Sequence, residues 1–390
     1  MRGLATLIAL LVLAACGGGG GGGSSGPTPL VYTGSTSPAV ITATNASKLA
    51  ADVVGNGDTA STILGISIES SDATRNRGSG VIDLALRLNR NIRDTLLRAG
   101  QASAAQRPVN AVIPVDETVS CDGNNGSVRT SGTLNDDSTG TLTVSFNNCL
   151  IDSVTLSGSA TLRVDAVASP FPAPTDFTLS FTRLTLRGPG LSLDATGSLR
   201  AQLSLGTTET ITADLVSLDN STNKMTKTEG LKIENVYDNL EMPSFFAATV
   251  SGKVFDQDHG FVNITTPMPI TFGTLSQLFP DGGQLILAGA AIGAGNRSIR
   301  VSALSSTMVW LELDLDGDDV REITAFLKWT ELSGPVGADL ADNDSDRMHN
   351  SWEVAFGLNP TIDDAAFDPD LDNVSNLDEY MVARNPNIPG

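Results

Sequence analysis

Basic and aromatic residues are scarce in this chain, and their scarcity excludes some classes of protein. The 390 residues include 24 Lys and Arg against 44 Asp and Glu, a formal net charge of −20 at pH 7. A nucleic-acid partner is therefore not expected, because binding to phosphates depends on basic patches. Aromatic residues make up only 5% of the chain. Abundant Ser, Thr, Gly, Val and Leu favour β-structure with many turns over a helical bundle.

Histidine is also rare, and the sequence contains no recognised catalytic motif. The two histidines, His259 and His349, do not form a pair with zinc-binding spacing. The sequence has no phosphate-binding loop, and no Gly-x-Ser-x-Gly turn lies between a strand and a helix as in hydrolases. We therefore expect a protein that is not an enzyme, and we interpret His259 as a turn residue. A hydrolase that brings His259 to a distant nucleophile is kept as a third alternative.

The apolar run at residues 4–13 is too short to cross a bilayer as a helix. It follows the basic Arg2 and ends in the sequence Leu-Ala-Ala-Cys at residues 13–16, so residues 1–15 are interpreted as a signal peptide. Residues 13–16 resemble the lipobox of bacterial lipoproteins, in which the cysteine is diacylated and becomes the first mature residue. The resemblance implies that Cys16 carries a lipid that anchors the protein to a membrane of the cell envelope.

Residues 16–29 are expected to form a lipidated, flexible tether. Residues 17–23 are all glycine, and such a run does not pack. Gly17, rather than Asp, follows the cysteine, which by analogy with Gram-negative sorting indicates the outer membrane. Residues 30–46 read LVYTGSTSPAVITATNA and resemble a segment near the start of a group of bacterial lipoproteins of uncharacterised function. This second resemblance implies no catalytic or binding residues.

Residues 30–111 are expected to be a partly helical N-terminal segment. Asn45 is placed to cap a helix over residues 46–54, which Gly55 would end. Apolar residues at helical spacing predict a second helix over residues 81–98. Its arginines are interpreted as the solvated side of a core helix.

Residues 112–334 are expected to form an antiparallel β domain. Apolar and polar residues alternate at 141–146, 154–158, 177–181 and 201–205. This alternation predicts strands, and turn residues at 187–190 and 219–220 separate them. We expect a mainly β fold with on the order of ten strands in a meander. The pattern leaves open a sandwich, a half-open barrel or a curved sheet.

The cysteines that remain after lipidation form one candidate pair. The chain has three cysteines, and assigning Cys16 to the lipid leaves Cys121 and Cys149. In an exported protein, an even remainder predicts a disulfide bond between these two residues.

Residues 335–390 contain two acidic segments with the spacing of calcium loops. Counting from Asp342 and from Asp368, oxygen-bearing residues stand at positions one, three, five, nine and twelve, and position seven would contribute its backbone carbonyl. The candidate ligands of the first loop are Asp342, Asp344, Asp346, Met348, Asn350 and Glu353. Those of the second are Asp368, Asp370, Asp372, Val374, Asn376 and Glu379.

The two loops repeat at an offset of 26 residues, and each is expected to lead into a short helix, ended by Gly357 in the first case and by Asn385 and Pro386 in the second. No complete helix is expected before either loop. The tail therefore resembles the EF-hand-like, thrombospondin type 3-like calcium repeats of secreted bacterial proteins. Position six, where positive φ is preferred, is Arg347 in the first loop and Asn373 in the second. Because Asn tolerates that conformation better, we expect the first loop to bind more weakly.

A third acidic segment begins like these loops at Asp314, Asp316 and Asp318. Its twelfth position is Ala325, which has no carboxylate. We interpret it as an acidic hairpin turn, and whether it binds a metal is left open.

These features together predict a calcium-binding lipoprotein of the envelope or cell surface, with a structural or binding role. Its partners would be the membrane, through the lipid, and a protein, glycan or lipid ligand that the sequence does not identify. The alternative is a periplasmic or outer-membrane carrier that encloses an apolar ligand, which requires a wide apolar cavity.

Overall fold

The computed structural model describes residues 27–54 and 113–389, except 136, 138, 152–153, 168–173, 189–190, 205–206, 239–245, 274–278, 333–338 and 383. Cys16, the segments predicted to be a signal peptide and a glycine tether, and the helix predicted over residues 81–98 lie outside this part of the chain. No helix within it has both the length and the apolar composition that a membrane span requires.

The described residues form one antiparallel sheet of fourteen strands, each paired with its neighbour in the chain. The strands are β1 Ile113–Ser120, β2 Ser127–Leu134, β3 Gly140–Ile151, β4 Val154–Val167, β5 Pro174–Gly188, β6 Leu191–Leu203, β7 Thr208–Asp219, β8 Lys224–Tyr237, β9 Phe246–Asp256, β10 Gly260–Phe272, β11 Gly282–Ile292, β12 Gly295–Ala303, β13 Met308–Asp314 and β14 Ile323–Lys328. The short helices are α1 Ala46–Val54, the 3-10 turn η1 Asp122–Asn124, α4 Trp329–Leu332, α5 Asn350–Phe356 and α6 Asn376–Met381.

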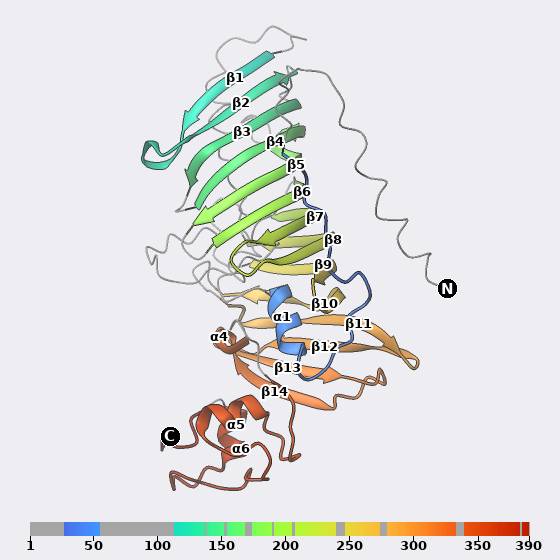
Figure 1. Cartoon of the computed structure of the whole chain (residues 1–390), viewed down its shortest axis with the longest axis vertical. Coiled ribbons are helices and arrows are strands. Elements are labelled where there is room, and N and C mark those ends of the chain that lie inside the picture. Colours follow the sequence, from blue (N-terminus) through green and yellow to red (C-terminus); the bar gives the residue numbers. More distant parts are fainter. Residues whose placement is uncertain are drawn as a thin grey trace, which may run out of the picture.

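This architecture confirms the mainly β meander and decides among the three forms left open. β1 and β14 are the two ends of the strand order and do not pair with each other, so the sheet is open. The strands are stacked along the long axis of the molecule, from β1 at one end to β14 near the other (Figure 1). There are more strands than expected, because several, such as β8, contain glycine or bulges that interrupt the alternation.

One face of the sheet is buried and the other carries charge. In β7, for example, Ile211, Ala213 and Leu215 are buried, whereas the intervening Asp214 is exposed. The exposed face carries ion pairs between neighbouring strands, such as Arg129 of β2 with Asp116 of β1. Each such exposed pair contributes little to stability, but the charges keep the outer face soluble. Period-two alternation thus places the core on one side, as strand geometry requires.

The disulfide bond predicted from the sequence is present between Cys121 and Cys149, with a Cα–Cα distance of 5.4 Å. Cys121 follows β1 directly, and Cys149 lies in β3 and is buried. The bond therefore ties the first hairpin to the third strand.

The segment before α1 runs along one side of the sheet, and its hydrogen bonds reach successive strands. The backbone of Ser35 donates to Gln257 (2.9 Å), and that of Ala39 donates to Phe261 (2.8 Å). Farther on, Arg297 of β12 donates to the carbonyl of Ile41 (3.1 Å). Figure 1 shows this segment descending beside β6 to β11 and ending in α1.

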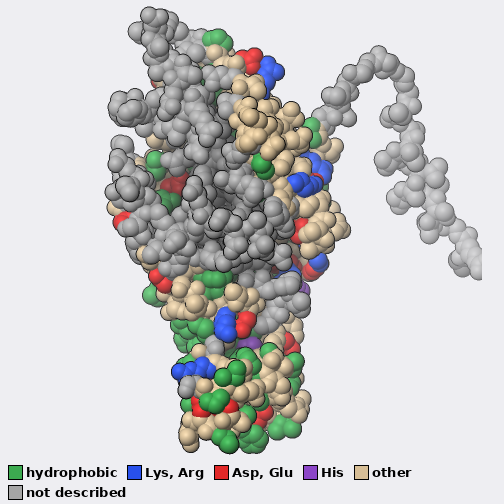
Figure 2. Space-filling view, turned by 90° about the vertical axis from the view of Figure 1, so that its left-hand side faces the viewer, with side chains coloured by type: hydrophobic (Ala, Val, Ile, Leu, Met, Phe, Trp, Pro, Cys, Tyr) green, Lys and Arg blue, Asp and Glu red, His purple; other side chains and the backbone are tan. Residues whose placement is uncertain are grey.

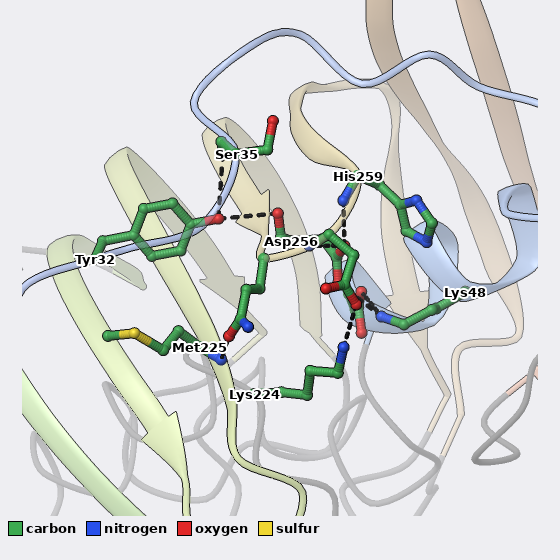
Figure 3. Close-up of polar contacts among 10 residues, drawn as sticks. Tyr32, Ser35, Lys48, Lys224, Met225, Asp256 and His259 are labelled. Atoms are coloured by element: carbon green, nitrogen blue, oxygen red, sulfur yellow. Dashed lines mark hydrogen bonds and ion pairs between the residues drawn. The ribbon is translucent and has the colours of Figure 1, made fainter. Parts of the chain in front are cut away.

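Asp256, at the end of β9, holds both this segment and the helix (Figure 3). The hydroxyl of Tyr32 donates to its backbone oxygen (2.9 Å), and Lys48 of α1 donates to its Oδ2 (2.7 Å). Its Oδ1 accepts from the backbone N–H of His259 (2.7 Å). His259 therefore occupies the β9–β10 turn, as predicted.

The helix predicted over residues 46–54 is observed as α1, but its predicted cap is wrong. Asn45 Oδ1 accepts from the backbone N–H of Thr42 (2.9 Å), and its amide donates to the carbonyl of Val40 (3.0 Å). The Asn45 side chain therefore orders the chain before the helix, because the preceding turn brings these backbone groups within its reach.

The C-terminal body, residues 339–389, lies beyond β14 at the end of the stack (Figure 1). A small aromatic cluster joins it to the sheet: Tyr380 of α6 meets Phe326 of β14 edge to face at 6.3 Å. Trp310 of β13 stacks on Phe326 at 5.4 Å, and Trp352 of α5 packs against Tyr380 at 5.1 Å. The body thus covers the β14 end of the sheet, an edge that would otherwise be open to pairing.

Candidate metal centre

Each acidic loop of the C-terminal body leads directly into a short helix, as the sequence predicted. His349 caps α5 by accepting from Trp352 N–H at Nδ1 (3.1 Å), and Gly357 ends it with φ of 76°. Burial lowers the pKa of His349 to about 4, so Nδ1 stays free to accept. Ser375 caps α6, which ends at Met381, earlier than the predicted stop at Asn385. Both caps fix the orientation of the helix that carries the twelfth residue.

The first aspartate of each loop organises the backbone around it. Asp342 accepts from the backbone N–H groups of Asp346 (3.2 Å) and Arg347 (3.0 Å). Asp368 accepts from the equivalent Asp372 (3.2 Å) and Asn373 (2.8 Å). The two loops therefore share one fold, and their internal repeat is structural as well as sequential.

The turn position predicted at the sixth residue has the expected conformation in both loops. Arg347 has φ of 77° and Asn373 has φ of 68°. Positive φ also occurs at the fourth residue, Ser345 and Leu371, each at 65°, which the sequence did not signal. These conformations turn successive N–H groups toward the first aspartate, which offsets their steric cost.

The three aspartates of each loop converge, as the spacing predicted. Asp342, Asp344 and Asp346 can place one oxygen each within 4.8 Å of one another, and Asp368, Asp370 and Asp372 do the same. The twelfth residues, Glu353 and Glu379, are both 0% exposed, and among the described residues neither Oε1 nor Oε2 of either side chain has a hydrogen-bond partner. A buried carboxylate without a partner is costly, so these side chains call for a cation or a proton.

The pKa shifts have the direction expected for crowded carboxylates. Burial, together with Asp344, Asp346, Asp364 and Asp342, raises the pKa of Glu353 to about 8. The pKa of Glu379 is also raised, by burial and by the second aspartate triplet, whereas Arg384 acts to lower it. A divalent cation would offset this repulsion in either loop.

The seventh and ninth residues have further packing roles. Met348 is buried among the aromatic side chains, and its backbone N–H donates to Asp346 Oδ1 (2.9 Å), as Val374 N–H does to Asp372 Oδ1 (2.8 Å). Asn350 Oδ1 accepts from Asn343 N–H (3.2 Å). The amide nitrogen of Asn376 donates to the carbonyl of Asp364 (2.9 Å), while its buried Oδ1 has no partner.

Asp364 was missed by the sequence analysis. It lies between the loops, is 7% exposed, and can place an oxygen within 4.8 Å of Asp346 and Glu353. The twelve-residue spacing contains no signal for it, because it approaches the first loop only through the fold of the connecting segment.

The third acidic segment adopts a similar loop but is neutralised differently. Asp314 accepts from Gly317 N–H (2.6 Å) and Asp319 N–H (3.0 Å), and also pairs with Arg321 Nη1 (3.2 Å). Glu322, which the spacing did not indicate, joins Asp314, Asp316 and Asp318 in an acidic group. Arg321 therefore offsets the charge of the buried Asp314 within this turn.

Comparison of the chain with protein-family models, curated proteins and solved structures found no match. The structure itself shows an open antiparallel meander sheet, followed by a C-terminal body with acidic clusters that could hold metal ions.

Proposed function

We propose that the protein is a lipid-anchored protein of the cell envelope whose C-terminal body binds two calcium ions, one in each acidic loop. The observation that carries the calcium proposal is the pair of glutamates, Glu353 and Glu379, whose carboxylate oxygens are buried and have no hydrogen-bond partner among the described residues. Aspartate and glutamate oxygens, the backbone carbonyls of Met348 and Val374, and the amide oxygens of Asn350 and Asn376 would complete each shell.

Calcium fits these ligands better than other biological metals. All the candidate ligand atoms are hard oxygens, and calcium accepts six to eight of them in flexible geometry. Zinc and copper prefer nitrogen and sulfur. Affinity on the order of 0.1 to 1 mM is expected, the range of extracellular modules.

Calcium titration of the full chain, followed by calorimetry, tests this proposal. The wild type should bind two calcium ions and bind magnesium much more weakly, since magnesium requires stricter octahedral geometry. Glu353→Gln and Glu379→Gln should each remove or weaken one site, and the double variant should lose both. Asp363→Asn, a change at an exposed carboxylate, serves as control. Absence of calcium binding at millimolar concentration would refute the proposal.

The envelope location rests on the lipobox-like residues 13–16 and the glycine run that follows them. Mass spectrometry of the mature protein should show an acylated Cys16 as its first residue. Cys16→Ser should release the protein from the membrane fraction. Cleavage at another position, with Cys16 unmodified, would contradict this part of the proposal.

The shape suits a structural or binding role outside the membrane. The sheet forms a long stack with the calcium-binding body at its far end, and the chain enters along the side of the stack (Figure 1). On the face shown in Figure 2, hydrophobic and acidic side chains lie together over the C-terminal body at the lower end. Among the residues described, no observation favours the carrier or the hydrolase, and neither is proposed.

A further inference from the structure

We propose that Asp364, contributed by the segment between the two repeats, is a ligand of the first calcium site, and that this site binds calcium more tightly than the second. The inference rests on the proposed calcium function and adds a residue outside the twelve-residue loop. It also reverses the order of affinity expected from Arg347 at the turn position.

The geometry places Asp364 on the inner side of the first loop. One oxygen each from Asp346, Glu353 and Asp364 can lie within 4.8 Å of the others. These three side chains belong to residues that are 4%, 0% and 7% exposed, respectively. Asp346 also belongs to the triplet with Asp342 and Asp344, so the two acidic groups meet at this residue.

The unpartnered atoms in this cluster point to a cation. Both carboxylate oxygens of Glu353 and Oδ2 of Asp346 are buried, and no described residue forms a hydrogen bond with them. In the described part of the chain, no lysine or arginine forms an ion pair with Asp346, Glu353 or Asp364. Three buried carboxylates without a counter-charge cannot all be ionised at low cost, whereas a divalent ion would satisfy them together.

The second repeat holds Asp364 in place. Asn376, the first residue of α6, donates from its amide to the carbonyl of Asp364 (2.9 Å) and is fully buried. Phe367 N–H donates to the same carbonyl (2.9 Å), which closes a turn before the second loop. The backbone of Asp364 is thus held in place by Asn376 and by the turn at Phe367.

At the second site, no described residue outside the loop joins the acidic group of Asp368, Asp370 and Asp372. The repeat offset of 26 residues carries Asp364 onto Gly390, a residue without a side-chain carboxylate that lies outside the described residues. Arg384 follows α6, its backbone N–H donates to the carbonyl of Glu379 (2.9 Å), and its positive charge opposes the rise in the pKa of the Glu379 carboxyl. Among the described residues, the first site therefore has five side-chain carboxylates and the second has four. Since ligand charge count tunes calcium affinity, the first site should be tighter.

Calorimetric titration of the full chain with calcium chloride tests this inference, with Asp364→Asn compared against Asp363→Asn. Asp363 is the adjacent residue, is exposed and belongs to no acidic group. The titration should show two binding phases, a tighter one for the first site and a weaker one for the second. Asp364→Asn should reduce the calcium affinity of the tighter phase about tenfold or more, because one anionic ligand is lost, and should leave the affinity of the weaker phase unchanged. Asp363→Asn should titrate like the wild type.

Glu379→Gln provides a second measurement that does not depend on how the Asp364 variant folds. It should remove the weaker phase and keep the tighter one. The inference is overturned if Glu379→Gln abolishes the tighter phase, or if Asp364→Asn and Asp363→Asn titrate alike. In those cases the wild type still binds two ions and the calcium function stands. A wild type that binds no calcium refutes both.

Discussion

The direction in which the pKa of an aspartate or glutamate is shifted in this protein depends on the charges that lie beside its carboxylate. On the exposed sheet face, Arg200 hydrogen-bonds to Asp176 and lowers the pKa of that carboxyl. In the C-terminal body, Glu353 has carboxylates around it and its pKa rises. The first kind of carboxylate is stable when ionised, and the second requires a cation or a proton. The abundance of acidic residues alone does not distinguish them.

Asp52 of α1 belongs to the second kind, and it predicts a pH dependence of stability. Burial raises its pKa to about 7 from the ordinary value of 3.8, with Asp256 adding to the rise and Lys48 opposing it. Since the folded pKa is the higher one, the contribution of Asp52 to the free energy of unfolding is full below about pH 4 and is lost as pH rises toward 7.

Urea denaturation at pH 5 and pH 8 checks this effect. Asp52→Asn should reduce the loss of stability between the two pH values by about 1 to 2 kcal/mol, allowing for solvent screening. Asp165→Asn, at an exposed position of β4, should leave the loss unchanged. An identical pH response of Asp52→Asn and the wild type would show that Asp52 ionises normally in the fold.

Among the strands, β1, β2 and β3 are the ones that the disulfide bond joins. β1 has a neighbour on one side only, so its pairing with β2 is less supported than that of a central strand. The bond between Cys121 and Cys149, 28 residues apart, restricts the unfolded chain around the first hairpin. This end of the sheet should therefore depend on the disulfide more than the rest does.

Replacing both cysteines by serine should lower the free energy of unfolding by about 3 to 4 kcal/mol on the chain-entropy model. The loss should appear first as faster amide exchange in β1 and β2, while the β8–β9 pair keeps its protection. Reduction of the wild type should reproduce the effect. Equal loss of protection across all strands would show instead that the sheet unfolds as one unit.

For the molecule as a whole, we expect calcium bound at the proposed sites to be coupled to the sheet through the aromatic cluster. Tyr380 follows Glu379, and its ring packs against Phe326 of β14 and Trp352 of α5. Calcium that holds Glu379 would also hold Tyr380 on the end of the sheet. Binding at a concentration of 100 Kd at one site would stabilise the docked body by about 2.7 kcal/mol.

Tyr380→Ala should therefore uncouple calcium from the sheet. We expect calcium to slow amide exchange in β13 and β14 of the wild type and to have little effect on those strands in the variant. The variant should also lose about 3 kcal/mol of stability through the cavity left behind. Phe367→Ala, at an aromatic residue that is 62% exposed, is the matched control and should behave like the wild type. Full calcium protection of β14 in Tyr380→Ala would disprove the coupling.

The sequence by itself determined the local features. Alternation predicted strands such as residues 141–146 within β3, Gly357 marked the end of α5, and the remaining cysteines indicated the disulfide. The spacing of the aspartates predicted which carboxylates of each loop converge. These predictions succeeded because backbone periodicity, turn preference and short-range ligand spacing are properties of adjacent residues.

The tertiary structure alone decided that the sheet is single and open, since alternation describes one strand at a time and is the same in a sandwich or a barrel. It also decided that Asp364 reaches the first loop and that Phe326 meets Tyr380, because contacts between distant segments depend on the path of the intervening chain. Asn45 is a further example of a contact that the sequence did not predict. Asparagine is a common helix cap, but the side chain of Asn45 forms hydrogen bonds with the backbone of the preceding turn instead. Local patterns specify the parts, whereas long-range packing determines which parts meet.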